Sequence, residues 1–178
     1  MQAHRRTLVS EAEFLTLPES TQRIELLDGE VIVSPGPTFW HQEILRRIVF
    51  SLGQWAARQT DPVTVGQSPL DVRFGPDRIL QPDAFLSLEA IPADHAGPIA
   101  RIPDLCVEVL STGRLYDRVT KRFIYAHAGV REYWVVEPAG VIERFFGPEL
   151  TQVEEIRDRL TSPLLAGYEL DLEALFRM

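Results

Sequence analysis

The spacing of apolar residues changes several times along the chain, which predicts alternating short strands and helices. Residues 38–59 are expected to form the longest helix, because their apolar positions recur at helical spacing. These positions are Ile44, Leu45, Ile48, Val49, Leu52 and Trp55. The dipeptide Asp61-Pro62 ends this helix, since proline cannot continue it.

Three shorter helices are predicted from their end signals. Residues 7–15 are expected to form a short amphipathic helix, with Ser10 and Glu13 in a capping-box pattern. Residues 115–128 predict a helix that stops at Gly129, a residue type that favours helix C-caps. A last short helix is expected near Leu172.

Apolar runs between the predicted helices indicate strands. The turn dipeptide Asp28-Gly29 separates residues 24–27 from residues 30–33, which is the strongest short hairpin signal. A second hairpin is expected to pair residues 132–137 with residues 141–146. The remaining predicted strands are residues 63–65, 70–73, 79–86 with an interruption at Pro82, 105–110 and about 150–156.

This order of elements predicts one α/β domain, in which a central mixed β-sheet is flanked by helices and preceded by an N-terminal hairpin. A chain of 178 residues is the size of one domain and is long enough to bury a substantial core. We therefore expect residues 1–178 to form a single domain. Its core is expected over about residues 14–137, with a C-terminal strand and short helix within residues 141–176.

Composition narrows the class of protein. The only cysteine, Cys106, lies in an apolar run, which excludes an internal disulfide and suits a reducing cytoplasm. We find no signal peptide and no apolar run of membrane-spanning length, so we expect a cytoplasmic protein without a membrane partner. The net charge of −8 argues against tight nonspecific binding of nucleic acid across the whole surface. Basic residues within residues 101–131 nevertheless allow a local basic face.

Glu108 is the first candidate for a functional residue. It interrupts the apolar run at residues 105–110, and a buried glutamate is rare unless it is paired or bound to a metal. The alternation of side chains along a strand places Asp104, Cys106, Glu108 and Leu110 on one face. A structural ion pair between Glu108 and an arginine is the competing interpretation.

Lys121 and Asp83 are the other two candidates. Lys121 is the single lysine among seventeen arginines, and its helix must pack back on the sheet that contains Glu108. The competing interpretation of Lys121 is a solvated pair with Asp117, four residues earlier. Asp83 follows Pro82, which marks a bend or an edge in a sheet, although an aspartate there is also typical of a turn cap.

From about residue 14 to residue 136 the chain closely resembles the PD-(D/E)XK nuclease superfamily, and within it a bacterial family of small, single-domain proteins similar to restriction endonucleases. The order and spacing of several short motifs make this resemblance specific. The motifs are Ile24-Glu25-Leu26-Leu27-Asp28-Gly29-Glu30, His41, Gln81-Pro82-Asp83, Val107-Glu108-Val109-Leu110-Ser111, Asp117 through Lys121 to Tyr125, Ala128-Gly129-Val130 and Glu132-Tyr133-Trp134.

Two departures from the pattern stand out. Leu110 occupies the position two after Glu108, where the superfamily carries its lysine. In the resembled family this lysine has moved to the following helix, which fits Lys121. The second departure is Thr112, at a position where family members often carry a proline after the serine.

The resemblance implies a DNA endonuclease that depends on Mg²⁺, with Mn²⁺ as a substitute. Asp83 and Glu108 are then metal ligands, and the Val109 carbonyl is expected to complete a set of hard oxygen ligands. The ion is expected to lower the pKa of an attacking water and to neutralise charge on the phosphorane. Lys121 is expected to orient this water or to stabilise the same charge.

Further residues of the resembled region have competing interpretations. Glu25 could add a metal ligand or hold a second ion, and an outward-facing strand residue is the competing interpretation. His41 could reach the site, although a histidine at a helix start is more often structural or exposed. Tyr125 and His127 are interpreted as packing and surface residues.

Two other functions compete with the endonuclease. The first is a non-catalytic or weakly active module on the same fold that binds nucleic acid or regulates. The second is a plain α/β domain in which the acids and the lysine form a structural cluster. A homodimer is compatible with cleavage of both DNA strands, but no segment of the sequence marks an interface.

Overall fold

The computed structural model describes residues 8–18, 20, 22–111 and 116–177. Thr7, Thr112, Gly113 and Leu115, which belong to predicted helices and a predicted turn, lie outside the described residues. The helices are α1 (Glu11–Phe14), α2 (Phe39–Ala56), the π-helical segment η1 (Tyr116–Lys121), α3 (Arg122–Ala128), the 3₁₀ turn η2 (Pro148–Leu150) and α4 (Leu172–Phe176). The strands are β1 (Arg23–Leu27), β2 (Glu30–Ser34), β3 (Thr64–Gln67), β4 (Val72–Gly75), β5 (Arg78–Leu80), β6 (Ala84–Ser87), β7 (Leu105–Val109), β8 (Glu132–Glu137), β9 (Val141–Phe146), β10 (Gln152–Ile156), β11 (Arg159–Thr161) and β12 (Glu169–Asp171).

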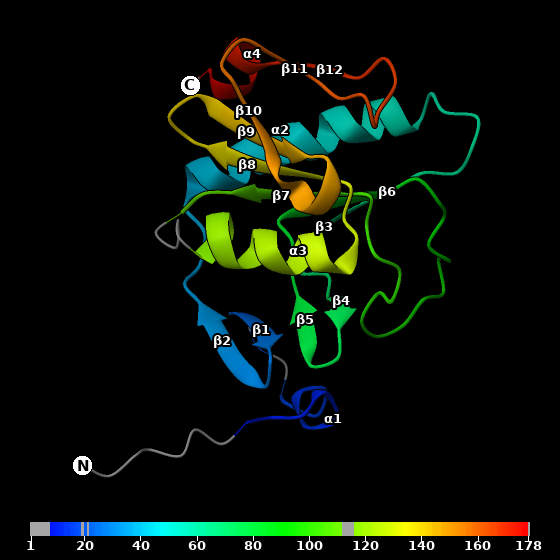
Figure 1. Ribbon diagram of the computed structural model, residues 1–178, viewed down its shortest axis with the longest axis vertical. Helices are drawn as coiled ribbons and strands as arrows, with labels where there is room; N and C mark the ends of the chain where they lie inside the picture. Colours follow the sequence, from blue (N-terminus) through cyan, green and yellow to red (C-terminus); the bar gives the residue numbers. More distant parts are fainter. Residues whose placement is uncertain (1–7, 19, 21, 112–115, 178) are drawn as a thin grey trace.

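The central sheet has six strands in the order β10-β9-β8-β7-β6-β3 (Figure 1). Strands β7 and β8 pair in parallel, with Leu105 opposite Glu132, and the other neighbours are antiparallel. A parallel pair needs a crossover connection, which η1 and α3 provide. The predicted mixed sheet flanked by helices is therefore confirmed.

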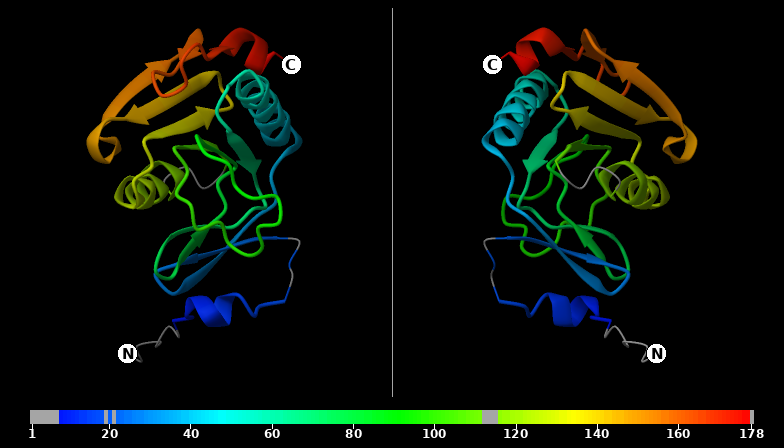
Figure 2. Two further views of the ribbon diagram at one scale, coloured as in Figure 1. Left: turned by 90° about the vertical axis from the view of Figure 1, so that its right-hand side faces the viewer. Right: turned by 90° about the vertical axis from the view of Figure 1, so that its left-hand side faces the viewer.

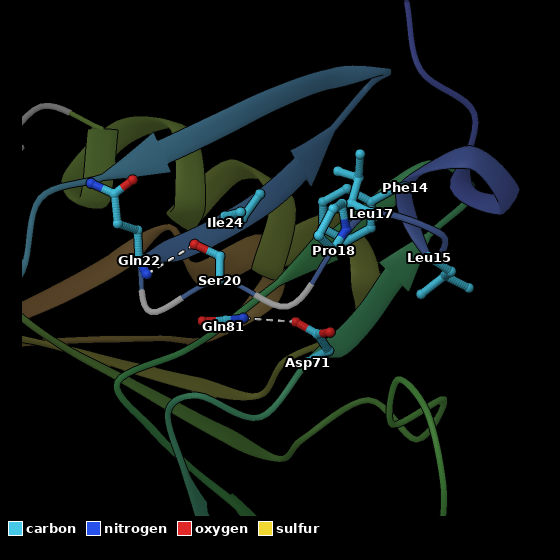
Figure 3. Close-up of a pocket in the computed structure, with 9 residues that line it drawn as sticks. All are labelled: Phe14, Leu15, Leu17, Pro18, Ser20, Gln22, Ile24, Asp71 and Gln81. Carbon is cyan, nitrogen blue, oxygen red and sulfur yellow. Dashed lines mark hydrogen bonds between the residues drawn. The ribbon is translucent and has the colours of Figure 1, made fainter.

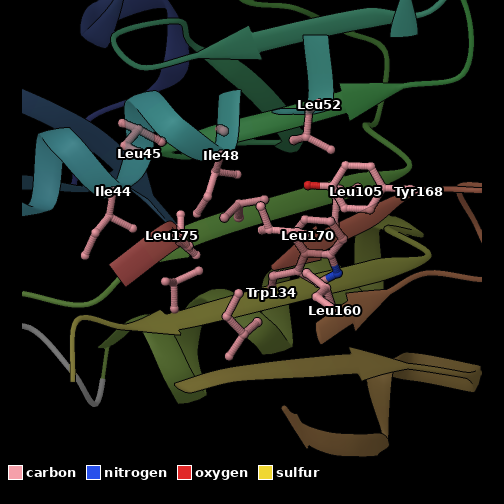
Figure 4. Packing of buried hydrophobic residues seen from close by; sticks show 14 of the residues in the cluster. Ile44, Leu45, Ile48, Leu52, Leu105, Trp134, Leu160, Tyr168, Leu170 and Leu175 are labelled. Atoms are coloured by element: carbon pink, nitrogen blue, oxygen red, sulfur yellow. The ribbon is translucent and has the colours of Figure 1, made fainter. Parts of the chain in front are cut away.

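Helix α2 covers one face of this sheet. Thr38 caps its N-terminus by accepting a hydrogen bond from the His41 amide, as serine and threonine caps commonly do. The apolar face of α2 packs on alternate residues of β7 and on Trp134, and the segment from β11 to α4 closes the same core (Figure 4). The C-terminal segment thus belongs to the core of the sheet.

Helix α3 covers the opposite face of the sheet, as the two side views show (Figure 2). Its Tyr125 ring packs against Phe74, with centroids 4.7 Å apart, and edge-on against Tyr133 at 5.2 Å. Cys106 and Leu110 lie in this second core, whereas Leu105, Val107 and Val109 lie in the first. The predicted alternation of β7 side chains is confirmed.

The N-terminal hairpin forms as predicted, with Asp28 and Gly29 at positive φ in its turn. It does not extend the central sheet. Strand β1 pairs with β5, and β5 with β4, so the hairpin belongs to a separate four-stranded sheet of order β2-β1-β5-β4. The sequence analysis predicted the strands but not their division between two sheets.

Close packing restricts the residue type at one position where β3 pairs with β6. Gly66 lies opposite Phe85 in the ladder, and the Phe85 ring occupies the space that a side chain at position 66 would need. A Cβ atom on Gly66 would fall 2.1 Å from Phe85 Cζ, so only glycine fits here.

Four details differ from the sequence predictions. Helix α1 is shorter than residues 7–15, although its Ser10–Glu13 capping box is confirmed. The helix predicted over residues 115–128 is wound as a π-helix in its described first part. Leu150 lies in the η2 turn before β10, and the small sheet of β11 and β12 was missed. Within the described part of the chain, no helix is long and apolar enough to cross a membrane.

Candidate active site

A cleft of about 1110 Å³ opens between the two larger sheets. Its walls come from the hairpin, the start of α2, the bend between β5 and β6, the C-terminal end of β7 and η1. All five predicted site residues line it, namely Glu25, Asp83, Glu108, Val109 and Lys121. The fold therefore brings together positions that are up to 96 residues apart in sequence.

Lys121 is buried at the end of η1, with 1% of its surface exposed. Its Nζ lies 2.9 Å from Glu108 Oε1, 3.1 Å from Glu25 Oε1 and 3.9 Å from Asp117 Oδ1. The interpretation of Lys121 as a solvated partner of Asp117 is therefore wrong. Burial alone would lower its pKa, but the charges of Glu108 and Glu25 dominate and raise it, so the ammonium stays charged.

Glu108 is 1% exposed on β7 and holds its Oε1 between two donors. Lys121 Nζ donates at 2.9 Å and the Tyr125 hydroxyl donates at 2.7 Å. Burial raises the pKa of Glu108 to about 8, against the opposing charge of Lys121. Tyr125, interpreted from the sequence as a packing residue only, thus also binds a candidate ligand.

Asp83 follows Pro82 in the bend between β5 and β6 and is 3% exposed. Its Oδ2 accepts a hydrogen bond from the Val109 amide at 2.8 Å and contacts His41 Nε2 at 3.1 Å. Burial would raise the pKa of Asp83, but the His41 contact and the charges of Arg23 and Lys121 lower it to about 2. Its side chain therefore binds the neighbouring strand as an ionised carboxylate and does not cap a turn.

Glu25 faces inward and is fully buried, so the outward-facing interpretation is wrong. Its Oε1 accepts from the Gln81 amide at 2.9 Å and contacts Lys121, while its Oε2 has no hydrogen-bond partner among the described residues. A buried oxygen without a partner is costly, which leaves Oε2 available to a ligand.

Arg23 was missed by the sequence analysis. Its Nη2 lies 3.0 Å from Asp83 Oδ1 and 3.9 Å from Glu108 Oε2, and it donates to the Gln81 carbonyl. The signal was present in the sequence, because Arg23 precedes Glu25 by two residues on one strand and therefore faces the same side.

The donor set of this cluster fits a hard divalent cation. Four buried carboxylic acids, Glu25, Asp83, Glu108 and Asp117, face two cations, Lys121 and Arg23. When all the acids are ionised, two negative charges remain uncompensated. Carboxylate and carbonyl oxygens are the ligands that Mg²⁺ and Mn²⁺ prefer.

The expected ligand set is small. No group of three or more His, Cys, Asp or Glu side chains in the described ranges is arranged to hold a metal ion. The set expected from the resemblance has two carboxylates, Asp83 and Glu108, and the backbone carbonyl of Val109. The Val109 amide bonds to Asp83, which places this backbone beside the carboxylate.

A smaller hollow of about 180 Å³ adjoins the cleft behind the hairpin (Figure 3). It shares Ser20, Gln22, Asp71 and Gln81 with the cleft, and the Gln81 amide group donates to Asp71 at 2.9 Å. The candidate ligands lie in the larger cleft, so we place the functional site there.

This arrangement places an acid on β7, an acid just before β6 and a buried lysine together at one end of a mixed sheet. The chain belongs to the Uma2 family, described as "Putative restriction endonuclease", whose model matches residues 11–173. Its fold is similar to that of a crystal structure described as "a putative nuclease belonging to DUF820" from Anabaena variabilis ATCC 29413. The TM-score is 0.78 at 24% sequence identity, over 94% of this chain and 97% of that chain. No curated protein matches the sequence.

Proposed function

We propose that this protein is an endonuclease that hydrolyses DNA phosphodiester bonds with the help of Mg²⁺ or Mn²⁺. The observation that carries the proposal is the burial of the only lysine, Lys121, against Glu108 and Glu25 at the base of a cleft. Burying a lysine is costly unless its ammonium is paired with an opposite charge. Charged groups in clefts whose pKa is strongly shifted are concentrated at functional sites. The family membership supports the same chemistry.

Asp83 and Glu108 would hold the ion, with the Val109 carbonyl as a third protein ligand. Each carboxylate has one oxygen fixed by the fold. Asp83 Oδ2 is held by Val109 and His41, and Glu108 Oε1 by Lys121 and Tyr125. The other oxygen of each faces Arg23 and would be the one that binds the ion. When bound, the ion supplies Lewis-acid stabilisation of the phosphate charge and lowers the pKa of a nearby water.

Lys121 would act as a charged donor and not as a base. Its raised pKa keeps the ammonium protonated near neutral pH, so it cannot accept a proton from water. It would orient the attacking water or stabilise the charge that develops on the phosphate. Glu25 would hold the ammonium in place, because its Oε1 lies 3.1 Å from Nζ.

The proposal is tested by incubating purified protein and supercoiled plasmid with Mg²⁺, with Mn²⁺ or with a chelator. Cleavage is expected only with the ions, and Asp83→Ala or Lys121→Ala should abolish it. Crystals soaked in Mn²⁺ should show anomalous density between Asp83 and Glu108. DNA binding without cleavage across many substrates would instead favour the non-catalytic binding module. If the protein neither cleaves nor binds DNA, the remaining interpretation is that the acids and the lysine form a structural cluster.

A further inference from the structure

Arg23 faces the second carboxylate oxygen of Asp83 and of Glu108, for which no other partner is found in the described part of the chain. Asp83 Oδ2 and Glu108 Oε1 have partners elsewhere in the protein. Asp83 Oδ1 and Glu108 Oε2 instead face Arg23 Nη2, at 3.0 Å and 3.9 Å. These are the two oxygens that an ion held by both residues would use.

An ion and the guanidinium cannot share these oxygens without strong repulsion. A divalent ion coordinates a carboxylate oxygen at about 2.1 Å. Since Nη2 is 3.0 Å from Asp83 Oδ1, an ion bound to that oxygen would lie within about 5 Å of Nη2 wherever it sits. Like charges at this distance in a buried site oppose each other, so binding of the ion favours movement of the guanidinium away from the two carboxylates.

Arg23 is more exposed than the two carboxylates, so it is the group that moves in this proposal, at the cost of its hydrogen bond to the Gln81 carbonyl. Its side chain is 22% exposed and lines the cleft, whereas those of Asp83 and Glu108 are 4% and 1% exposed. Its Nε has no hydrogen-bond partner among the described residues. The guanidinium can therefore swing out into the cleft while the two carboxylates stay fixed.

We propose that Arg23 is the resident counter-cation of the ion site. It neutralises Asp83 and Glu108 in the metal-free protein, limits the affinity for the divalent ion by competing for the same two oxygens, and leaves them when the ion binds. This inference rests on the ion site of the proposed function and assigns to Arg23 the role of a positioning residue.

The first test is the affinity for Mn²⁺, measured through the electron paramagnetic resonance of the free ion. Arg23→Gln removes the competing charge and should bind Mn²⁺ about tenfold more tightly than the unaltered protein. Arg23→Lys keeps a cation and should stay close to the unaltered affinity. Arg78→Gln is the matched control, because it removes an arginine that pairs with Asp28 and does not line the cleft.

A second measurement is made on the unaltered protein and uses a conservative variant only to assign one resonance. The arginine Nε–H resonances of the unaltered protein are recorded during a titration with Mg²⁺, and Arg23 is assigned by its loss in Arg23→Lys. The Arg23 resonance should shift with the same saturation curve as the ion, while that of Arg78 should not. An Arg23 resonance unchanged at saturating Mg²⁺ would overturn the inference.

The two proposals fail differently. If neither ion binds the unaltered protein, the proposed function loses its ion site and the inference falls with it. If Asp83→Asn abolishes Mn²⁺ binding but Arg23→Gln binds no more tightly than the unaltered protein, the ion site stands. Only the competition by Arg23 is then refuted.

Discussion

Lys121 Nζ and Glu108 Oε1 lie 2.9 Å apart in the interior, although 13 positions separate the residues in the chain. The pair joins the end of η1 to the middle of the central sheet, and both side chains are about 1% exposed. Such a pair is costly to break, because the remaining charge is left buried without its partner.

Lys121→Met should lower the rate of plasmid cleavage by at least about 10²-fold, because it removes a preorganised charged donor. It should also lower the free energy of unfolding by about 3–5 kcal/mol, measured in urea, since Glu108 and Glu25 lose their cation. Arg131→Met is the control, because Arg131 is exposed, pairs with Asp104 and does not line the cleft. Cleavage by Lys121→Met at the unaltered rate would contradict the proposed role.

Tyr125→Phe tests the second donor to Glu108. Loss of the hydroxyl that donates to Glu108 Oε1 at 2.7 Å should cost about 1–3 kcal/mol of stability and weaken Mn²⁺ binding. Tyr133→Phe is a matched control, since its buried hydroxyl donates to the Asp117 carbonyl instead. We expect a similar loss of stability from both variants, measured by thermal unfolding. Equal effects of both on Mn²⁺ affinity would remove the special role of Tyr125.

The stability of the metal-free protein should depend on pH through Glu108. Its pKa is raised from an ordinary 4.5 to about 8, so between these values the folded state binds a proton that the unfolded state has lost. The free energy of unfolding should therefore fall as pH rises from 5 to 8, by at most about 1.4 kcal/mol per pH unit. The glutamine in Glu108→Gln cannot titrate, so this variant should lack the pH-dependent part of the free energy of unfolding. The measurement is urea unfolding of both proteins with a chelator present. The assignment would be refuted if the free energy of unfolding of the unaltered protein, minus that of Glu108→Gln, stayed constant or rose as the pH increased from 5 to 8.

The pairing of β3 with β6 allows a test of the fold outside the candidate active site. Gly66→Ala should destabilise the protein by about 1–3 kcal/mol, because the added Cβ would overlap the Phe85 ring. Gly53→Ala, in α2, meets nothing within 4 Å and should raise stability by about 0.5–1 kcal/mol. Thermal unfolding checks both. The double variant Gly66→Ala with Phe85→Leu should recover part of the loss, and no recovery would place the strain elsewhere.

Local patterns predicted most elements of the fold, because helices and hairpins follow from short-range spacing and turn residues. The hairpin at Asp28-Gly29 and the alternation along β7 are examples. The division into two sheets was not predictable in the same way. It depends on β1 pairing with β5, about 50 residues later, and no local pattern specifies that partner.

The candidate site was predicted in part. The residues Asp83, Glu108 and Lys121 were singled out by an acid after a proline, an acid in an apolar run and a unique lysine, and the structure brings them together. Arg23 was missed because its position on the face of Glu25 becomes informative only once Glu25 is known to face the site. The π-helical winding of η1 was missed because helical periodicity does not distinguish it from an ordinary helix.

The contact of Lys121 with both Glu25 and Glu108 has a consequence for the architecture. Glu25 belongs to the four-stranded sheet and Glu108 to the six-stranded sheet, so one ammonium ties the two layers at the base of the cleft. Under the proposed function, natural selection for DNA cleavage and for contact between the two sheets would act on the same nitrogen atom. An engineer who sought a more robust scaffold by placing an apolar side chain at this position would also remove a contact that joins the two sheets.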